Sequence, residues 1–375
     1  MNPDDILVIG AGPAGLAVAA CLHAAGLPYT LVEREAHVAA TWRRHYDRLH
    51  LHTTRDLSTL PHGPWPTGTP TYPSREQVVA YLDAYAARHG ISPRVGVTVE
   101  HVRRDGDRFT VRTDRGTLTP RVVVFATGTN AVPVKPDFPD LENFAGSVTY
   151  AATYRNPAPY GGKRTLVVGS GNSGAEIALD LAEHGVEVSM VVRGPVHVVP
   201  RDVLGRPSQA TSILLSRLPI DVRDRIVGTV MRLAVGDLSR YGIRRPTRGL
   251  NRTIVEDGRI PMLDIGTVRM IRAGRIRVLP AVQRVHAADV TFADGRTLPF
   301  DALILATGYR PGLEGVIDGY GALSDDRGRP RVNGGLSGAE GLYFVGYGIA
   351  PTGVLRTIAQ EAPRVAALVK RDVSA

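Results

Sequence analysis

Two stretches of the chain share one order of apolar and polar positions. The first opens with the apolar run ILVIG at residues 6–10, passes through the glycine turn GAGPAG and a helix of small residues, and closes on the strand YTLVE at residues 29–33. Strand, turn, helix and strand within about 30 residues indicate a βαβ unit. The order is repeated in RTLVVGSGNSGAEIALDLAEHGVEVSMVVR, residues 164–193. The pattern therefore predicts two units built on parallel strands.

A second pattern, of short strands joined by turns, follows each unit. The same strands in the same spacing occur in FTVRTDRGTLTPRVVVFATGTN at residues 109–130 and in VTFADGRTLPFDALILATGYRP at residues 290–311. Each stretch returns through an Ala-Thr-Gly turn. The chain is therefore internally duplicated, and we predict an α/β fold with two Rossmann-like domains of the three-layer ββα, dinucleotide-binding kind.

Other segments depart from these patterns. Residues 40–73 are rich in His, Thr, Pro and aromatic residues and show little periodicity, as is typical of a segment that covers a site. Ser74 and Gln77 form the sequence pattern of a capping box, so we expect a helix to begin there. Residues 133–159 are rich in proline and are interpreted as a linker.

Composition limits the classes of function. The 375 residues carry a net charge of +9, but the charges are dispersed, which favours a solvated surface over a nucleic-acid or anionic membrane partner. The single cysteine, Cys21, excludes an internal disulfide and a redox cysteine pair. We see no HExxH motif and no convincing acid pair, and we expect no metal site. Without a secretory leader or a stretch of about 18 apolar residues, we expect a cytoplasmic protein with no integral membrane association.

The first glycine turn has the form of a dinucleotide site. Gly10 gives the tight turn, Gly12 lets the backbone approach a pyrophosphate, and Gly15 packs the helix closely on the strand. The amide groups at the helix start then face negative charge. Glu33, eighteen residues beyond Gly15, would accept hydrogen bonds from a ribose with free hydroxyl groups. The turn suits FAD or NAD; the alternative is a helix start whose glycines serve packing alone.

The second glycine turn uses Gly169, Gly171 and Gly174, and the strand after it ends in Arg193 rather than in an acid. A carboxylate repels a 2′-phosphate and an arginine attracts one, so NADPH is the better fit. The alternative is a surface arginine in an arginine-rich chain. Three residues add polar groups at the helix start: Ser170, Asn172 and Ser173. We expect one turn to hold FAD and the other NADPH, so that hydride passes from nicotinamide to flavin.

With these motifs placed, the chain resembles the class B flavin-containing monooxygenases, and within them the YUCCA-like branch. The glycine turns occur in many flavoproteins, whereas YDRLHLH at residues 46–52 and LDIGT at residues 263–267 are narrower signals. The other matching stretches include ILVIGAGPAGLA, YPSREQ, ATGTNAVP, LVVGSGNSGAEIALDL, SMVVRGPVHVVPRD and FDALILATGYRP. The resemblance implies tightly bound FAD, NADPH as the donor, and a C4a-(hydro)peroxyflavin that is formed from O2 and shielded from water.

The duplication and the resemblance together give the expected domains. We expect an FAD-binding domain of residues 1–155 and 296–375, into which an NADPH-binding domain of residues 156–295 is inserted. The inserted domain contains a helical insertion at about residues 205–250, with two amphipathic helices broken at Pro219. Three interpretations of these helices stand: they line a substrate entrance, lie on a membrane surface, or form an ordinary helical insertion.

Further residues are expected to contact the cofactors. They lie in the first glycine turn, after Glu33, in the irregular segment, in the two Ala-Thr-Gly turns and near the C-terminus: Pro13, Ala14, Arg34, Trp42, Thr127, Gly128, Thr307, Gly308 and Gly346. For Trp42 the alternative is a core residue.

The polar candidates for catalysis are His52 and Asn130. The resemblance implies that the segment with Trp42 and RLHLHTTRD lies beside the flavin ring. For His52 the alternative is a hydrogen-bonded packing histidine, and for Asn130 it is turn chemistry just after a glycine.

One position departs from the family's linker pattern FxGxxxHxxxY. The chain reads FAGSVTYAATY, with Phe144, Gly146 and Tyr154 in place and Tyr150 where histidine is expected. Tyrosine donates a hydrogen bond but takes up no proton near neutral pH. Tyr150 is therefore a third candidate for catalysis, at the position expected to couple NADPH binding to oxygen activation.

The resemblance implies an NADPH-dependent flavoprotein monooxygenase that acts on a small molecule with O2, and it favours oxidative decarboxylation of an aromatic α-keto acid such as indole-3-pyruvate. N- or S-oxygenation and Baeyer-Villiger oxidation are open alternatives. A second hypothesis, motivated by Tyr150, is a non-oxygenating NADPH-dependent flavin oxidoreductase. A third is a flavoprotein fold used as a scaffold. We expect a monomer or a homodimer.

Overall fold

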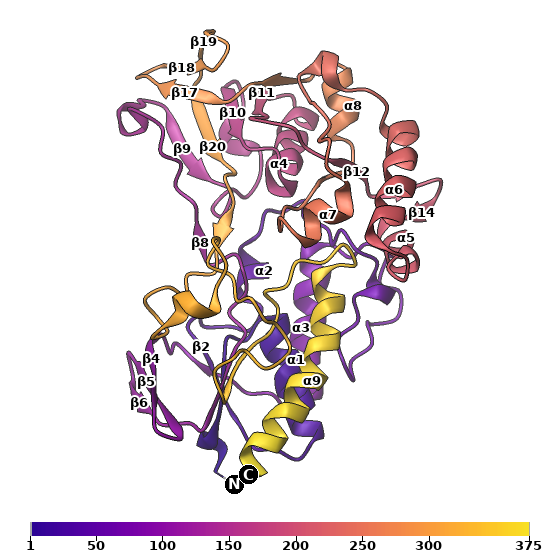
Figure 1. The fold of residues 1–375 in the computed structure, drawn as a ribbon. Coiled ribbons are helices and arrows are strands. Elements are labelled where there is room, and N and C mark those ends of the chain that lie inside the picture. The colour runs from indigo at the N-terminus through magenta and orange to yellow at the C-terminus, as the bar shows by residue number, and fades with distance from the viewer. Residues whose placement is uncertain (1, 375) are drawn as a thin grey trace. The chain divides into compact units, whose positions relative to one another are not determined.

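The computed structural model describes residues 2–374, and the chain divides into two compact units (Figure 1). Unit 1 consists of Met1–Arg44, Thr53–Val132 and Tyr309–Ala375, and unit 2 of His45–His52 and Pro133–Gly308. The sequence predicts residues 45–52, 133–155 and 296–308 in the FAD-binding domain, but all three segments lie in unit 2. Residues 133–155 and 296–308 each contribute a strand to the sheet of that unit, and residues 45–52 are hydrogen-bonded to the rest of the unit through Tyr46 and His52.

Unit 1 is built on a five-stranded parallel sheet. Its strands, in spatial order, are β22 (Leu342–Phe344), β7 (Val122–Phe125), β1 (Ile6–Ile9), β2 (Thr30–Glu33) and β3 (Arg94–Val95). Every residue of β1 and β7 is buried, which explains why both are continuous apolar runs in the sequence. Ile6 lies opposite Val122 and Ile9 opposite Phe125, so the two central strands end together.

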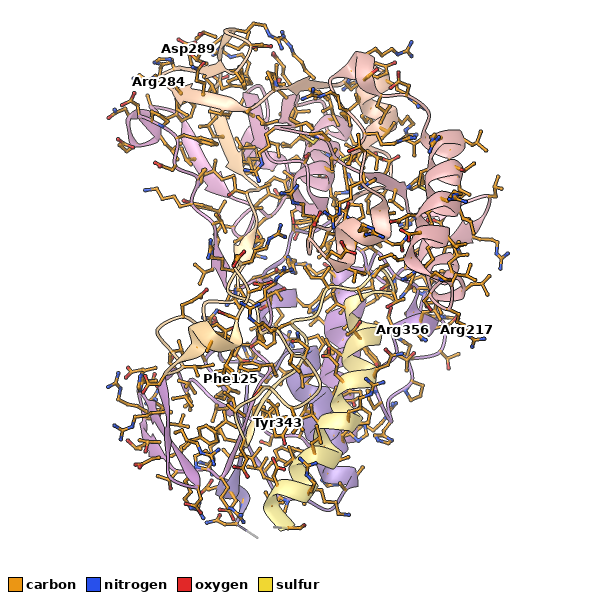
Figure 2. All side chains as sticks on the ribbon, viewed as in Figure 1. Phe125, Arg217, Arg284, Asp289, Tyr343 and Arg356 are labelled. Atoms are coloured by element: carbon orange, nitrogen blue, oxygen red, sulfur yellow. The ribbon has the colours of Figure 1, made fainter. Side chains whose placement is uncertain are left out.

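Helices cover one face of this sheet and an antiparallel meander the other. The helices α1 (Pro13–Ala24), α3 (Arg75–Arg88) and α9 (Val354–Ser374) lie side by side (Figure 1). The meander contains β4 (Val99–Asp105), β5 (Arg108–Thr113) and β6 (Gly116–Leu118). Phe109 and Val111 of the meander share a core with Phe125 of the sheet, whose side chain is labelled in Figure 2. The predicted three layers are confirmed in unit 1.

The predicted capping box opens α3. The Ser74 hydroxyl accepts a hydrogen bond from the Gln77 amide, and the Ser74 amide donates one to the Gln77 side chain at 2.9 Å. Val78, Leu82 and Tyr85 form a buried apolar face of this helix.

Unit 2 repeats the plan. Its parallel sheet has the order β16 (Ile276–Leu279), β11 (Glu187–Val191), β10 (Arg164–Val168), β20 (Ala302–Leu305) and β9 (Ser147–Tyr150). The helices α4 (Asn172–Glu183) and α8 (Thr267–Arg272) pack against it, and its meander contains β17 (Val282–Val285), β18 (Asp289–Phe292) and β19 (Thr297–Pro299). Phe292 shares a core with Leu166 and Leu303, while Arg284 and Asp289 lie on the outer meander (Figure 2).

A helical insertion lies between β11 and β16. It contains β12 (Val198–Pro200), β13 (Asp202–Val203), β14 (Arg206–Pro207), α5 (Ser208–Leu215), α6 (Ile220–Val235), α7 (Leu250–Val255) and β15 (Met262–Asp264). Pro219 is the N-cap of α6, so the predicted break between two helices is confirmed. Val222, Ile226 and Val230 lie four residues apart on one face of α6 and are exposed, so the apolar side of this helix is partly open to solvent.

The remaining elements are short. They are α2 (Ala40–Arg44), β8 (Val132–Pro133), β21 (Tyr309–Arg310) and the 3-10 helices Pro3–Asp5, Arg55–Leu57, Leu141–Asn143, Ala158–Tyr160, Ser239–Tyr241 and Tyr320–Leu323. Within residues 2–374, no helix has both the length and the apolar character that crossing a membrane requires.

Candidate functional site

The first glycine turn is shaped by contacts that leave no room for side chains at two of its three glycines. Gly10 has a φ of +101°, and a Cβ atom there would lie 2.8 Å from the Ala126 carbonyl oxygen. A Cβ atom at Gly15 would overlap the carbonyl oxygen of Gly10. At Gly12, by contrast, a Cβ atom would meet no atom of the described chain within 4 Å beyond its own neighbours. The space beside Gly12, at the start of α1, therefore fits a ligand whose phosphates approach the backbone.

Glu33 lies at the end of β2 and faces this turn. One carboxylate oxygen accepts a hydrogen bond from the Ala11 amide at 2.7 Å, and the other accepts one from the Glu35 amide at 3.1 Å. The carboxylate is thus fixed next to the glycine turn, as a ribose-binding acid requires. Arg34, the next residue, forms an ion pair with Glu35 at 3.4 Å.

Three turns of unit 1 meet at the carboxyl edge of its sheet. The glycine turn follows β1, Thr127 and Gly128 follow β7, and Gly346 follows β22. Gly346 has a φ of +83°, and a Cβ atom there would lie 2.9 Å from the Ala14 side chain at the start of α1. Ligands of parallel α/β sheets bind at this edge, so these residues form one candidate site.

Two buried side chains hold these turns in place. The Tyr347 hydroxyl lies 3.1 Å from the Thr127 amide, which donates to it, and 2.7 Å from the Thr127 hydroxyl. Burial raises the pKa of Tyr347 to about 12. The Gly346 amide donates to the Glu361 carboxylate at 2.8 Å, and burial raises the pKa of Glu361.

Two other residues of unit 1 that the sequence predicts near the cofactors, Asn130 and Trp42, differ in their burial. Asn130 is exposed, and its side-chain oxygen accepts a hydrogen bond from the Thr129 hydroxyl at 3.3 Å, which agrees with turn chemistry. Trp42 lies in the short helix α2 and is half-buried.

The second glycine turn repeats the geometry of the first. A Cβ atom at Gly169 would overlap the Ala306 carbonyl oxygen, and one at Gly174 would overlap the Gly169 carbonyl oxygen. At Gly171, a Cβ atom would meet nothing within 4 Å in the described chain beyond its neighbours. Unit 2 thus has the same open space at the start of α4.

The polar residues around this second turn divide into engaged and free side chains. The Asn172 side-chain oxygen accepts a hydrogen bond from the Leu263 amide at 2.9 Å, and the Thr307 hydroxyl donates to the Val134 carbonyl at 2.5 Å. The side chains of Ser170 and Ser173 have no hydrogen-bond partner within residues 2–374, and Gly308 follows Thr307 with a φ of +98°. Arg193 is exposed and forms no ion pair with any residue that the structure describes.

His52 belongs to unit 2 and lies against α4. Its Nε2 atom is 2.9 Å from Glu176 Oε2, and the Tyr46 hydroxyl donates to the same oxygen at 2.8 Å. Glu176 is 2% exposed. The structure therefore contains a buried acid next to a candidate catalytic histidine, which the sequence pattern did not reveal.

A second buried acid follows one turn later on α4. Asp180 is 3% exposed and accepts a hydrogen bond from the Tyr154 hydroxyl at 2.8 Å. Burial raises the pKa of both Asp180 and Tyr154. Glu176 and Asp180 are i, i+4 neighbours, and this spacing of two acids within an apolar helix is the signal that the sequence offers for them.

The linker pattern around Tyr150 has structural functions at its other positions. Phe144 is buried in the core of unit 2, and a Cβ atom at Gly146 would lie 2.5 Å from the Asp301 carbonyl oxygen. Tyr154 is bound to Asp180, as described above. Tyr150 ends β9 opposite Leu305 and is half-buried, and its hydroxyl has no hydrogen-bond partner in the described part of the chain.

Residues 2–374 contain no group of three or more His, Cys, Asp or Glu side chains arranged to hold a metal ion.

Known proteins match the chain over nearly its whole length. The family model described as pyridine nucleotide-disulphide oxidoreductase matches residues 7–204. Indole-3-pyruvate monooxygenase YUCCA1 of Oryza sativa subsp. japonica is 43% identical over 348 residues, 91% of this chain and 86% of that protein. YUCCA6 of Arabidopsis thaliana, also an indole-3-pyruvate monooxygenase, is 40% identical over 91% of this chain and 85% of its own length.

Solved structures agree with the fold. The flavin-containing monooxygenase from Stenotrophomonas maltophilia is 26% identical, with a TM-score of 0.74 over 98% of each chain. OTEMO in complex with FAD and NADP, at 17% identity, has a TM-score of 0.73 over 99% of this chain and 86% of that chain, a likeness of fold alone.

Proposed function

Because the chain belongs to the flavin-containing monooxygenase family, in the branch of the YUCCA indole-3-pyruvate monooxygenases, we propose that it uses FAD, NADPH and O2 to oxidise an aromatic α-keto acid. The family makes the protein an oxidoreductase of the monooxygenase kind. In the proposed reaction, the α-keto acid, O2, NADPH and a proton give a carboxylic acid one carbon shorter, CO2, NADP+ and water. One oxygen atom of O2 enters the acid and the other leaves as water.

The observation that carries the proposal is the repeated glycine turn. In each unit the first and third glycines are required by backbone contacts, whereas Gly12 and Gly171 border open space at a helix start. A cradle of this shape, with the helix amides facing it, fits the pyrophosphate of a dinucleotide. Two such cradles in one chain support two dinucleotides, one as prosthetic group and one as electron donor.

We assign FAD to unit 1. Glu33 is held against the turn by its hydrogen bond to the Ala11 amide, and it would bind the ribose hydroxyl groups of the adenosine half. Thr127 and Gly346 lie on the two turns that share the carboxyl edge of the sheet, and they would border the rest of the cofactor. A carboxylate at this position disfavours a 2′-phosphate, which agrees with FAD.

We assign NADPH to unit 2. Arg193 lies two residues beyond the end of β11, near the position that corresponds to Glu33 at the end of β2. It carries the opposite charge and forms no ion pair with any other described residue. A guanidinium group that is free of carboxylates is available to a 2′-phosphate. Ser170 and Ser173 add free hydroxyl groups at the helix start.

When bound, reduced FAD supplies the two electrons and the site of O2 activation, by the C4a-(hydro)peroxyflavin route that the family resemblance implies. The protein holds both nucleotides, orients the carbonyl group of the substrate and keeps water away from the reacting atoms. We propose His52 and Asn130 as polar side chains that contribute to these tasks.

An isotope experiment tests the proposal. The FAD-loaded protein is incubated with NADPH, indole-3-pyruvate and 18O2, and the 18O content of the products is measured by mass spectrometry. We expect one 18O atom in indole-3-acetate, and CO2 released in a 1:1 ratio to the NADPH consumed. Unlabelled products across a panel of α-keto acids, amines, sulfides and ketones would contradict any oxygenase function.

One observation favours a second candidate function. Tyr150 stands where the family pattern has histidine, and its hydroxyl has no partner among residues 2–374. If a histidine at this position couples NADPH binding to oxygen activation, replacing it by tyrosine removes that coupling. The protein would then be an NADPH-dependent flavin oxidoreductase that releases hydrogen peroxide. Rapid-mixing spectra of the reduced protein with O2 distinguish the two functions, since immediate return to oxidised flavin supports the oxidoreductase.

A further inference from the structure

Glu176 is a buried carboxylate whose hydrogen bonds come from one short segment. Its Oε2 atom accepts from the Tyr46 hydroxyl at 2.8 Å and lies 2.9 Å from His52 Nε2, while its Oε1 atom is buried without a partner in the described chain. Burying a carboxylate is unfavourable unless charge or hydrogen bonds compensate it. Residues 45–52 provide that compensation, so the segment and α4 are energetically linked.

The neighbouring acid Asp180 anchors the same region in a different way. It accepts from the Tyr154 hydroxyl at 2.8 Å, and Arg48 Nη1 and His184 Nδ1 lie 3.8 Å and 3.5 Å from its other oxygen. Arg48 also forms an ion pair with Glu183 at 2.7 Å. Both acids fasten the 45–52 segment to α4, but only Glu176 contacts an imidazole of that segment.

The contact favours one tautomer of His52. The Tyr46 hydroxyl already donates to Glu176 Oε2, so this oxygen acts as an acceptor, and His52 Nε2 beside it is best paired as an N–H donor. Nδ1, which has no partner within residues 2–374, is then the position that is free to accept or release a proton. The side chain is 20% exposed, so this nitrogen retains access to solvent or ligand.

We propose that Glu176 is a positioning residue for His52: it holds the imidazole by Nε2 and presents Nδ1 for hydrogen bonding or proton transfer at the active site. This inference rests on the proposed monooxygenase function only in its last clause. The arrangement itself is a property of unit 2. It explains why an apolar helix that follows a nucleotide turn carries an acid at position 176.

A direct test observes the His52 N–H proton in the FAD-loaded protein. With 15N-labelled histidine, an imidazole N–H bonded to a buried carboxylate exchanges slowly with water and gives a downfield proton signal. His52→Asn identifies the signal by its loss. We expect E176Q to lose the signal or move it upfield, because a neutral amide is a weaker acceptor than a carboxylate.

Two variants separate positioning from general stability. Asp180→Asn replaces a buried acid one turn away but leaves the Glu176 contact. Tyr46→Phe removes one donor to Glu176 Oε2 and leaves His52 in place. Both variants should keep the signal. Should E176Q fail to fold, Tyr46→Phe decides the matter, because loss of the signal there contradicts the inference. An unchanged signal in E176Q, or equal loss in Asp180→Asn, overturns it.

Turnover gives an independent readout through a double-mutant cycle. We expect E176Q to lower kcat roughly tenfold or more with the KM for NADPH changed by less than about threefold, as a misplaced group does. Combined with His52→Asn it should add no further loss, because Glu176 acts through His52. If the kcat losses of the two single variants multiply in the double variant, Glu176 has a structural role. If neither the wild type nor any variant forms labelled product, the proposed monooxygenase function is wrong. The His52 N–H signal then still tests whether Glu176 positions His52.

Discussion

Gly15 packs directly against Gly10, so that a Cβ atom at Gly15 would overlap the Gly10 carbonyl oxygen. Gly174 has the same relationship to Gly169 in unit 2. Between the two packed glycines of each turn lies a third glycine, Gly12 or Gly171, that borders open space. In each turn, therefore, the fold requires the first and third glycines, and a bound ligand would require the middle one.

This separation predicts opposite effects for two alanine substitutions. Gly15→Ala must displace α1 from the turn, which we expect to cost about 1–3 kcal/mol in the free energy of unfolding of the apoprotein. Gly12 has a φ of −80°, which alanine also adopts, and it borders open space. Gly12→Ala should therefore lower the free energy of unfolding by less than about 1 kcal/mol. It should nevertheless weaken FAD binding at least about tenfold, since the methyl group occupies the cradle.

Urea unfolding of the apoprotein and titration with FAD measure the two effects. Gly171→Ala and Gly174→Ala form the matched pair in unit 2, read out with NADP+ in place of FAD. Unimpaired FAD affinity in Gly12→Ala would show that the open space beside this glycine is not where the pyrophosphate lies.

The glycine turns were predictable because their requirements are local. Gly10, Gly12 and Gly15 lie within six residues, and the runs on either side read directly as a buried strand and a helix. The internal duplication of the sequence predicts the second glycine turn and the paired Ala-Thr-Gly turns in the same way. The three-layer arrangement of each unit followed from these patterns.

Glu176 and the unit boundaries were not predictable, because they depend on contacts between distant residues. Glu176 appears in the sequence as one polar residue in an apolar helix, and its partners Tyr46 and His52 lie 130 and 124 positions away. Residues 151–301 separate strands β9 and β20 in the sequence, and their pairing in the sheet shows that both belong to unit 2.

Arg193 predicts the preference for the electron donor. Arg193→Ala should raise the KM for NADPH about tenfold, a loss of about 1.4 kcal/mol, and leave the KM for NADH nearly unchanged, because only NADPH carries the 2′-phosphate. Steady-state rates with both donors measure this. Arg217→Ala, an exposed arginine next to α6 (Figure 2), is the control and should change neither value. Equal losses with both donors in Arg193→Ala would exclude a phosphate contact.

Tyr150 predicts how efficiently NADPH oxidation is coupled to product formation. Tyr150→His restores the family pattern, and we expect it to lower the fraction of NADPH electrons that appear as hydrogen peroxide. Tyr150→Phe removes a hydroxyl that has no partner within residues 2–374, so stability should change by less than about 0.5 kcal/mol and coupling should stay at the wild-type value. Peroxide and product are quantified per NADPH. A large change in Tyr150→Phe would mean that the hydroxyl itself acts in the reaction.

Glu361 predicts a pH dependence of stability. Burial raises the pKa of its carboxyl in the folded protein, against the opposing effects of the Gly346 amide and the Arg364 charge. A carboxyl with a raised folded pKa contributes stability that is fully present below the unfolded pKa and is lost as pH rises through the folded pKa. The contribution of Glu361 to the free energy of unfolding of the apoprotein should therefore fall as pH rises from the ordinary glutamate pKa through the raised pKa of the folded protein.

Glu361→Gln isolates that contribution, since its amide is neutral throughout and still offers an oxygen to the Gly346 amide. We expect the variant to match the wild type in acid and to exceed its stability increasingly toward pH 8, as measured by urea unfolding at each pH. Glu142→Gln, at an exposed position, serves as the control and should leave the profile unchanged. A variant less stable than the wild type at pH 8 would mean that the ionised carboxylate is stabilised in place, by its hydrogen bond from Gly346, more than burial destabilises it.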